Sequence, residues 1–235
     1  MKYKAIIFDL DGTLLDTLTD LAEGTNYALR VNGFPERTID EIRRFVGNGA
    51  RKLVERAVPD GQVEAALEQV RQDFNVYYKV HCKDHTGPYP GIMEMLQSLI
   101  KAGYTLGVVS NKPDFAVQEL IPEYFPGIFA SVSGERQGVA KKPAPDLIWE
   151  AMKNLRADSS DAIYVGDSEV DLEAAANAGI PCISVAWGFK GRKFLEEQQA
   201  EMIIETPAEI FHYLQESQQK LSTSQGRAVV TPLFP

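Results

Sequence analysis

The segment from Phe8 to Asp16, which reads FDLDGTLLD, constrains this chain more than any other stretch. It follows a short apolar run at residues 3–7, which predicts a buried strand of a parallel sheet. Asp9 and Asp11 then stand one residue apart where that strand ends, and this edge of an open α/β sheet is where ligands bind. A carboxylate pair there can hold a cation, and one member can attack a substrate while the other moves protons.

Composition narrows the classes of partner. The 235 residues carry a net charge of −9, which argues against nucleic acid or an anionic membrane as the main partner. No apolar run reaches the roughly 18 residues that span a bilayer, and Asp9 and Asp11 interrupt the first apolar stretch too early for a signal peptide. Cys82 and Cys182 lie far apart and predict two free thiols, so we expect a cytoplasmic protein.

Strand-like and helix-like segments alternate between residues 101 and 185. This alternation predicts an α/β fold, a Rossmann-like parallel sheet with helices on both faces. Apolar runs predict strands at residues 104–109, 128–132, 162–165 and 181–185. Helical periodicity between them predicts helices at residues 115–121, 145–155 and 170–178.

The stretch after the first strand is different in kind. It contains no convincing strand, and its periodicity fits helices at residues 18–31, 50–57 and 63–78. We therefore predict a core formed by residues 1–15 and 89–214, with an all-helical cap at residues 16–88. Residues 215–235 are polar and repetitive before a short apolar end, which predicts a partly disordered tail.

Three later segments place polar side chains beside predicted strands. Ser110 and Asn111 stand in a loop after the second strand, where hydroxyl, amide and backbone N–H groups suit a phosphoryl oxygen. Lys142 precedes a proline, which restricts its backbone and aims a point charge. Asp167 and Asp171 lie four apart at a strand's end and offer hard oxygen ligands typical of Mg²⁺. Taken singly, each segment is also ordinary turn or helix-cap chemistry.

Together and in this order, the four segments resemble the motifs of the haloacid dehalogenase superfamily. The matching residues are Asp9-x-Asp11, Ser110, Lys142 and Gly166-Asp167-Ser168-x-x-Asp171. The helical insertion directly after the first motif resembles the members that carry a helical cap at that site. Within it, the segment FVGNGAR at residues 45–51 resembles the cap loop of phosphoglycolate phosphatases.

The resemblance implies a phosphatase mechanism. Asp9 would attack phosphorus and form an aspartyl-phosphate, while Asp11 would protonate the leaving alkoxide and later deprotonate water. Ser110 and Asn111 would bind the transferring phosphoryl group, and Lys142 would offset the charge on Asp9 and phosphate.

The same resemblance implies a magnesium site. Asp9, the backbone carbonyl of Asp11, and Asp167 would hold the ion, with Asp171 supporting it directly or through water. The substrate implied is a small phosphorylated metabolite, with 2-phosphoglycolate the first choice. Asn48, Gly49 and Arg51 are the cap residues that we expect to contact it, and for Arg51 an exposed helix position is an equal alternative.

Other activities on this fold remain open at this stage. The dehalogenase members of this superfamily lack the second aspartate of the first motif. The presence of Asp11 therefore favours phosphoryl transfer. A sugar-phosphate mutase shares all four motifs, whereas the phosphonatase branch needs a cap lysine, and nothing marks Lys52 or Lys79 for that role. A non-catalytic phosphate-binding protein is a distant alternative, since Asp9 and Asp11 are both present. The sequence leaves the oligomeric state open.

Overall fold

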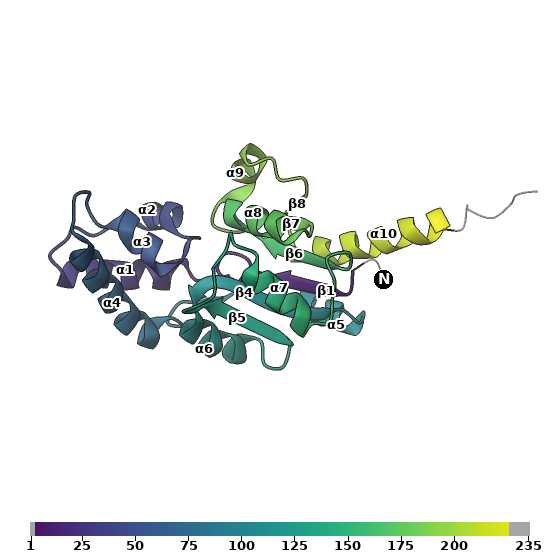
Figure 1. Ribbon diagram of the computed structural model, residues 1–235, viewed down its shortest axis with the longest axis horizontal. Helices are drawn as coiled ribbons and strands as arrows, with labels where there is room; N and C mark the ends of the chain where they lie inside the picture. Colours follow the sequence, from purple (N-terminus) through teal and green to yellow (C-terminus); the bar gives the residue numbers. More distant parts are fainter. Residues whose placement is uncertain (1–2, 226–235) are drawn as a thin grey trace, which may run out of the picture.

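A six-stranded parallel sheet forms the centre of the computed structural model, which describes residues 3–225 (Figure 1). The strand order is β5-β4-β1-β6-β7-β8, so the N-terminal strand lies between β4 and β6. In register, Ala5 of β1 pairs with Thr105 of β4 and with Ala162 of β6. The strands are β1 (Ala5–Phe8), β4 (Thr105–Pro113), β5 (Ser131–Glu135), β6 (Ala162–Gly166), β7 (Cys182–Val185) and β8 (Ile203–Ile204).

Helices cover both faces of this sheet, which confirms the predicted α/β class. Alternate residues of β1 serve the two faces, because successive strand side chains point to opposite sides. Ile6 and Phe8 belong to the larger apolar core, and Ala5 and Ile7 to the smaller one. The larger core includes residues of α5 (Ile92–Lys101), α6 (Asp114–Tyr124) and α10 (Pro207–Gln225), and the smaller core residues of α7 (Asp146–Asn154) and α8 (Glu169–Ala178).

Two segments differ from the sequence prediction. Residues 110–112, predicted as a loop, are the end of β4, which continues through a register shift to pair Pro113 with Glu135. Their polar character hid a strand whose residues 106–112 are all buried. The predicted tail at residues 215–235 begins as helix, because α10 starts at Pro207 and runs on to Gln225. Each residue added to a formed helix gains one backbone hydrogen bond, so even polar residues can prolong the helix. Residues 226–235 lie outside the described residues.

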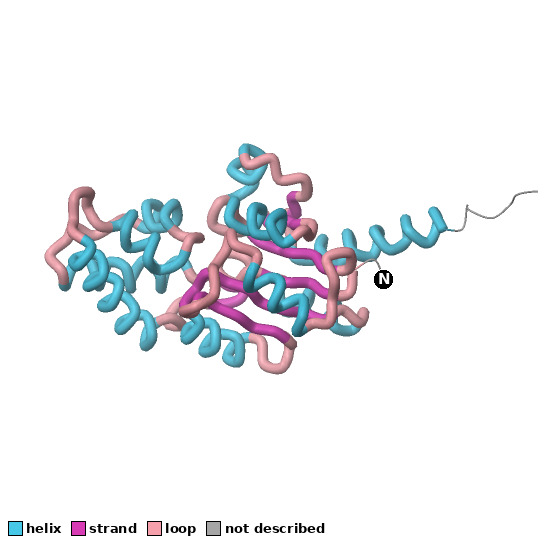
Figure 2. The backbone as a smooth tube through the Cα atoms, viewed as in Figure 1, coloured by secondary structure: helices cyan, strands magenta, loops and turns pink. Residues whose placement is uncertain are grey.

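Residues 17–86, which follow soon after β1, form helices and loops only, as the sequence predicted. Four helices lie together on one side of the sheet, at the left of Figure 1, and Figure 2 shows helix and loop there. They are α1 (Leu18–Val31), α2 (Ile39–Phe45), α3 (Gly49–Ala57) and α4 (Glu64–His81). The chain enters this group after β2 (Leu15–Asp16) and leaves it before β3 (Gly87–Pro88), and these two short strands pair antiparallel. Both crossings therefore lie side by side.

Helix α2 escaped the sequence reading because it buries little. Ile42 is its one buried residue, so it lacks an apolar stripe. A capping box between Thr38 and Glu41 starts the helix instead. The short helix α9 (Gly191–Glu197) connects β7 to β8. None of the described helices is long and apolar enough to cross a membrane.

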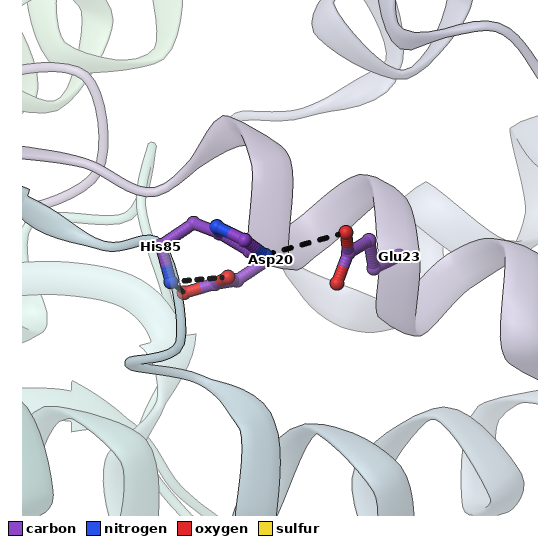
Figure 3. Close-up of side chains that lie close together, drawn as sticks. All are labelled: Asp20, Glu23 and His85. Atoms are coloured by element: carbon purple, nitrogen blue, oxygen red, sulfur yellow. Dashed lines mark hydrogen bonds and ion pairs between the residues drawn. The ribbon is translucent and has the colours of Figure 1, made fainter.

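A buried carboxylate joins the two crossings (Figure 3). Asp20, near the start of α1, accepts hydrogen bonds from the backbone N–H groups of His85 and Thr86, both at 2.9 Å, and from the Thr86 hydroxyl at 2.7 Å. His85 Nε2 lies 3.4 Å from Glu23 Oε1. The three side chains Asp20, Glu23 and His85 offer ligand atoms within 4.8 Å of one another. Because both oxygens of Asp20 already accept protein donors, this cluster serves the chain connection.

We expect Asp20→Ala to destabilise the fold by about 2–4 kcal/mol, because three donors lose their acceptor, two of them backbone N–H groups. Thermal unfolding should then begin roughly 5–10 °C lower. Glu23→Ala on the same helix is the matched control and should change the melting temperature little, since its ion pair is exposed. Equal melting temperatures for wild type and Asp20→Ala would show that the hydrogen bonds to Asp20 do not stabilise the fold.

Candidate active site

The four sequence-predicted segments meet at one edge of the sheet. Because β4, β1 and β6 are neighbours, Asp9 after β1, Ser110 and Asn111 in β4, and Asp167 after β6 come together. They line a chamber whose far wall is formed by the helical group. Its lining residues are Asp9, Asp11, Leu21, Val46, Gly47, Gly49, Ala50, Leu53, Phe74, Tyr78, Ser110, Asn111, Lys112, Pro113, Asp167 and Phe189.

Lys142 is the buried cation beneath this chamber. Its Nζ lies 2.8 Å from Asp9 Oδ1 and 2.7 Å from Asp171 Oδ1, and it donates to the Tyr164 hydroxyl at 2.8 Å. Burial alone would lower the pKa of Lys142, but Asp171 and Asp9 outweigh it and raise that pKa. Lys142 therefore stays protonated and fixes the orientation of the Asp9 carboxylate.

The carboxylates at this edge outnumber the ammonium groups that face them. Asp9, Asp167 and Asp171 are all buried, and their oxygens lie within 4.8 Å of one another. Burial and the charge of Asp171 raise the pKa of Asp9 to about 7, although Lys142 opposes the shift. Burial, Asp171 and Asp9 likewise hold the pKa of Asp167 well above its ordinary value. Three carboxylates beside one ammonium group leave a surplus of negative charge. A divalent cation that prefers hard oxygen ligands can neutralise it.

Asp171 is held by Lys142 and by the start of α8 (Glu169–Ala178). Its Oδ1 faces Lys142, while its Oδ2 accepts from the Ser168 N–H at 3.1 Å and hydroxyl at 2.7 Å, as part of the capping box of α8. Both oxygens are therefore occupied, and the side chain does not line the chamber. Asp171 thus positions Lys142, and because its oxygens lie in one cluster with those of Asp9 and Asp167, its supporting role at a cation stays a prediction.

Close backbone packing fixes Asp167. Gly12 has a φ of +83°, and a Cβ there would lie 2.5 Å from Asp167 Oδ2. A Cβ at Gly188 would overlap Asp167 as well. The Phe189 N–H donates to Asp167 Oδ2 at 2.7 Å. The sequence reading missed this segment after β7, since a Gly-Phe pair in a loop carries no distinctive signal.

Lys112 is the main site residue that the sequence reading missed. Its side chain is 1% exposed, and its Nζ lies 2.8 Å from Asp11 Oδ1 and donates to the Tyr78 hydroxyl at 2.6 Å. A signal was present: Lys112 precedes Pro113, so the argument that singled out Lys142 applies to it equally. Lys112 thereby ties Asp11 in the core to helix α4.

Asn111 lies in the chamber but is used differently from the prediction. Its amide Nδ2 donates to the Gly47 carbonyl at 3.1 Å and to the Lys142 carbonyl at 2.9 Å. An amide has two N–H donors, so this arrangement leaves none for a phosphoryl oxygen. The Asn111 side chain instead links the loop before α3 to the segment that carries Lys142.

The three expected cap residues do not all reach the chamber. Gly49 lines it, at a φ of +82°. Asn48 is outside the lining and accepts from Arg56 at 2.7 Å. Arg51 is also outside, more than half exposed, and paired with Glu55 and Glu64. It points away because α3 turns its apolar residues toward the core, so this geometry does not support Arg51 or Asn48 as substrate contacts.

Comparison with known proteins agrees with the motifs. The family model described as haloacid dehalogenase-like hydrolase matches residues 6–185. A curated phosphoglycolate phosphatase of Pseudomonas syringae pv. syringae is 34% identical over 206 residues, 85% of this chain and 76% of the relative. One of Mesorhizobium japonicum is 33% identical over 213 residues, 86% and 91% of the two chains. A crystal structure from Lactobacillus delbrueckii subsp. bulgaricus, provisionally assigned as a phosphoglycolate phosphatase, has TM-score 0.86 at 36% identity and covers 91% of this chain and 98% of its own.

The buried carboxylates predict a metal effect on stability that depends on pH. The pKa of Asp9 is raised from 3.8 to about 7 on folding, so without a cation its contribution is fully present below 3.8 and is lost as pH rises through 7. A divalent cation would bind the ionised form of the carboxylate. We expect Mg²⁺ to raise the melting temperature more at about pH 8.5 than at about pH 5.5, and Asp9→Asn to weaken that dependence. Equal metal shifts at both pH values would contradict the assignment.

Proposed function

Because the chain belongs to the haloacid dehalogenase-like hydrolase family, as its motifs predicted, we propose that it is a magnesium-dependent phosphatase that forms an aspartyl-phosphate. The expected enzyme class, a phosphoric monoester hydrolase, is confirmed by the family and by the curated relatives. Its proposed substrate is a small organic phosphate monoester, and 2-phosphoglycolate is the first candidate because both relatives described above bear that name. The observation that carries the proposal is the buried Asp9 facing the chamber between Lys142 and Asp11.

The chemistry follows from where each group stands. An Asp9 oxygen attacks phosphorus as the bond from phosphorus to the alcohol oxygen breaks, and Asp11 gives that oxygen a proton. Asp11 then takes a proton from the water that attacks the aspartyl-phosphate, which returns Asp9 to its carboxylate. Lys142 holds Asp9 in place and offsets its charge, while the Ser110 hydroxyl donates to the phosphoryl oxygens.

The proposed cation is Mg²⁺, held by Asp9, Asp167 and the backbone carbonyl of Asp11. When bound it neutralises phosphoryl charge and orients the reacting oxygens. The surplus of buried carboxylates over ammonium groups supports such a site. Since burial raises the pKa values of Asp9 and Asp167, a cation that favours their ionised forms would also prepare Asp9 as the nucleophile.

The chamber supports a small substrate. It has a volume of about 40 Å³ with the helices seated over it, which favours a small ester over a polymer. We propose that residues 16–88 form a cap that opens to admit the ester and closes to exclude water. A small phosphorylated metabolite is thus the expected partner, without nucleic acid or membrane. Cys82 and Cys182 are both free thiols, which supports the proposed cytoplasmic location.

The proposal is tested with a chromogenic aryl phosphate. Wild type should hydrolyse it with Mg²⁺ and lose activity in excess chelator. Asp9→Asn should lower kcat by roughly a thousandfold or more, because an amide is not a competent nucleophile. Glu173→Gln, which alters an exposed carboxylate on α8, is the control and should retain wild-type activity. Activity of Asp9→Asn within tenfold of wild type would reject the nucleophile assignment.

A panel of small monoesters tests the substrate. We expect 2-phosphoglycolate to rank among the highest values of kcat/KM, with phosphoproteins and nucleic acids inert, since the small chamber under the helices favours a short leaving group. A low rank would reject 2-phosphoglycolate and leave the phosphatase assignment intact. Interconversion of a hexose 1-phosphate and 6-phosphate without net hydrolysis would instead identify a mutase.

A further inference from the structure

The part of the chamber that faces the leaving group has an uneven chemistry. On the cap side its wall is mostly apolar, formed by Leu21, Val46, Ala50, Leu53 and Phe74. On the core side lie the carboxylates of Asp9, Asp11 and Asp167. Lys112 is the one cationic side chain that lines the chamber within the described part of the chain. A leaving group therefore meets hydrocarbon on most of its surface and a positive charge at one point.

The Lys112 ammonium has capacity for a ligand. Lysine carries three N–H donors, and its acceptors among residues 3–225 are Asp11 Oδ1 at 2.8 Å and the Tyr78 hydroxyl at 2.6 Å. One N–H is thus left over. The side chain is 1% exposed, so water competes weakly for that donor and an anion would be held more strongly than at the surface.

Tyr78 supplies a second donor at the same point. Its hydroxyl accepts from Lys112, and its own hydrogen has no protein acceptor among the described residues. Burial raises the pKa of Tyr78 well above its ordinary value, so the phenol keeps this hydrogen. Tyr78 belongs to α4 and Lys112 to β4, so the donor pair exists only when the helical group is seated on the core.

Building on the proposed phosphatase function, we propose that Lys112 and Tyr78 form the receptor for a carboxylate on the leaving alcohol, and so select carboxylated monoesters. Asp11 hands its proton to the ester oxygen, and Lys112 Nζ lies 2.8 Å from that same carboxyl group. A carboxylate one methylene away from the ester oxygen reaches this point, whereas a neutral substituent of equal size would leave the ammonium partly unpaired. Lys112 takes the part that the sequence reading gave to Asn48 and Arg51.

The test measures binding without turnover. Two phosphonates of matched size, 3-phosphonopropionate and propylphosphonate, differ in a carboxylate against a methyl group. Titration calorimetry with Mg²⁺ should show wild type binding the carboxylated compound roughly 10- to 100-fold more tightly, the range of a hydrogen-bonded ion pair. Lys112→Met should abolish that ratio, and Tyr78→Phe should reduce it severalfold without weakening propylphosphonate.

Two control variants separate this site from its rivals. Arg51→Met removes the other cation once expected to bind the substrate, and Lys83→Met removes a surface charge paired with Glu119 and Glu123. Both should keep the wild-type ratio. A ratio near one in wild type, a ratio that survives Lys112→Met, or a ratio lost in Arg51→Met would each overturn the inference.

Two further outcomes are decided in advance. If Lys112→Met does not fold, as its melting curve would show, Tyr78→Phe decides, and an unchanged ratio in that variant overturns the inference. Since no bond is broken in this assay, it stands apart from the phosphatase proposal. If wild type hydrolyses no monoester, the proposed function is rejected. If wild type binds the two phosphonates equally, only the carboxylate receptor is rejected.

Discussion

The ion cluster around Lys142 is the interaction on which the rest of the site depends. One ammonium group, almost without contact with solvent, holds Asp9, which follows the first strand, and Asp171 from the last motif. Removing one member of such a buried cluster leaves an uncompensated charge, which typically costs about 3–5 kcal/mol. The position of Asp171 is in turn secured by its bonds to Ser168, so the start of α8 and the nucleophile are fixed together.

The sequence predicted the sheet edge well because the topology is simple. A parallel sheet brings the carboxyl ends of neighbouring strands together, so Asp9, Ser110 and Asp167 had to converge once their strands were recognised. Lys142 followed from its place before a proline together with the resemblance of its segment to a family motif. Helices α2 and α10 were not predicted, since α2 lacks an apolar stripe and the last turns of α10 have a polar sequence.

The cap contacts were harder to predict, because they depend on which face of a helix meets the core. Arg51 and Ala50 are adjacent in sequence, yet one is exposed and the other lines the chamber. A shift of one residue on a helix turns the side chain by about 100°, which is enough to move it off the face that meets the core. Lys112 and Tyr78 meet across 34 residues of chain, and no local pattern announces that contact.

The hydrogen-bonded carboxylate of Asp20 has a mechanical consequence for the helical group. It binds segments 66 residues apart in sequence, so the two connections between helices and sheet cannot lengthen or twist independently. A body attached through two separate flexible links can slide and tilt in several directions, whereas one attached at a single fused joint mainly swings. If the helical group opens as proposed, substitutions in either connection should therefore alter the same motion, because both connections share one joint.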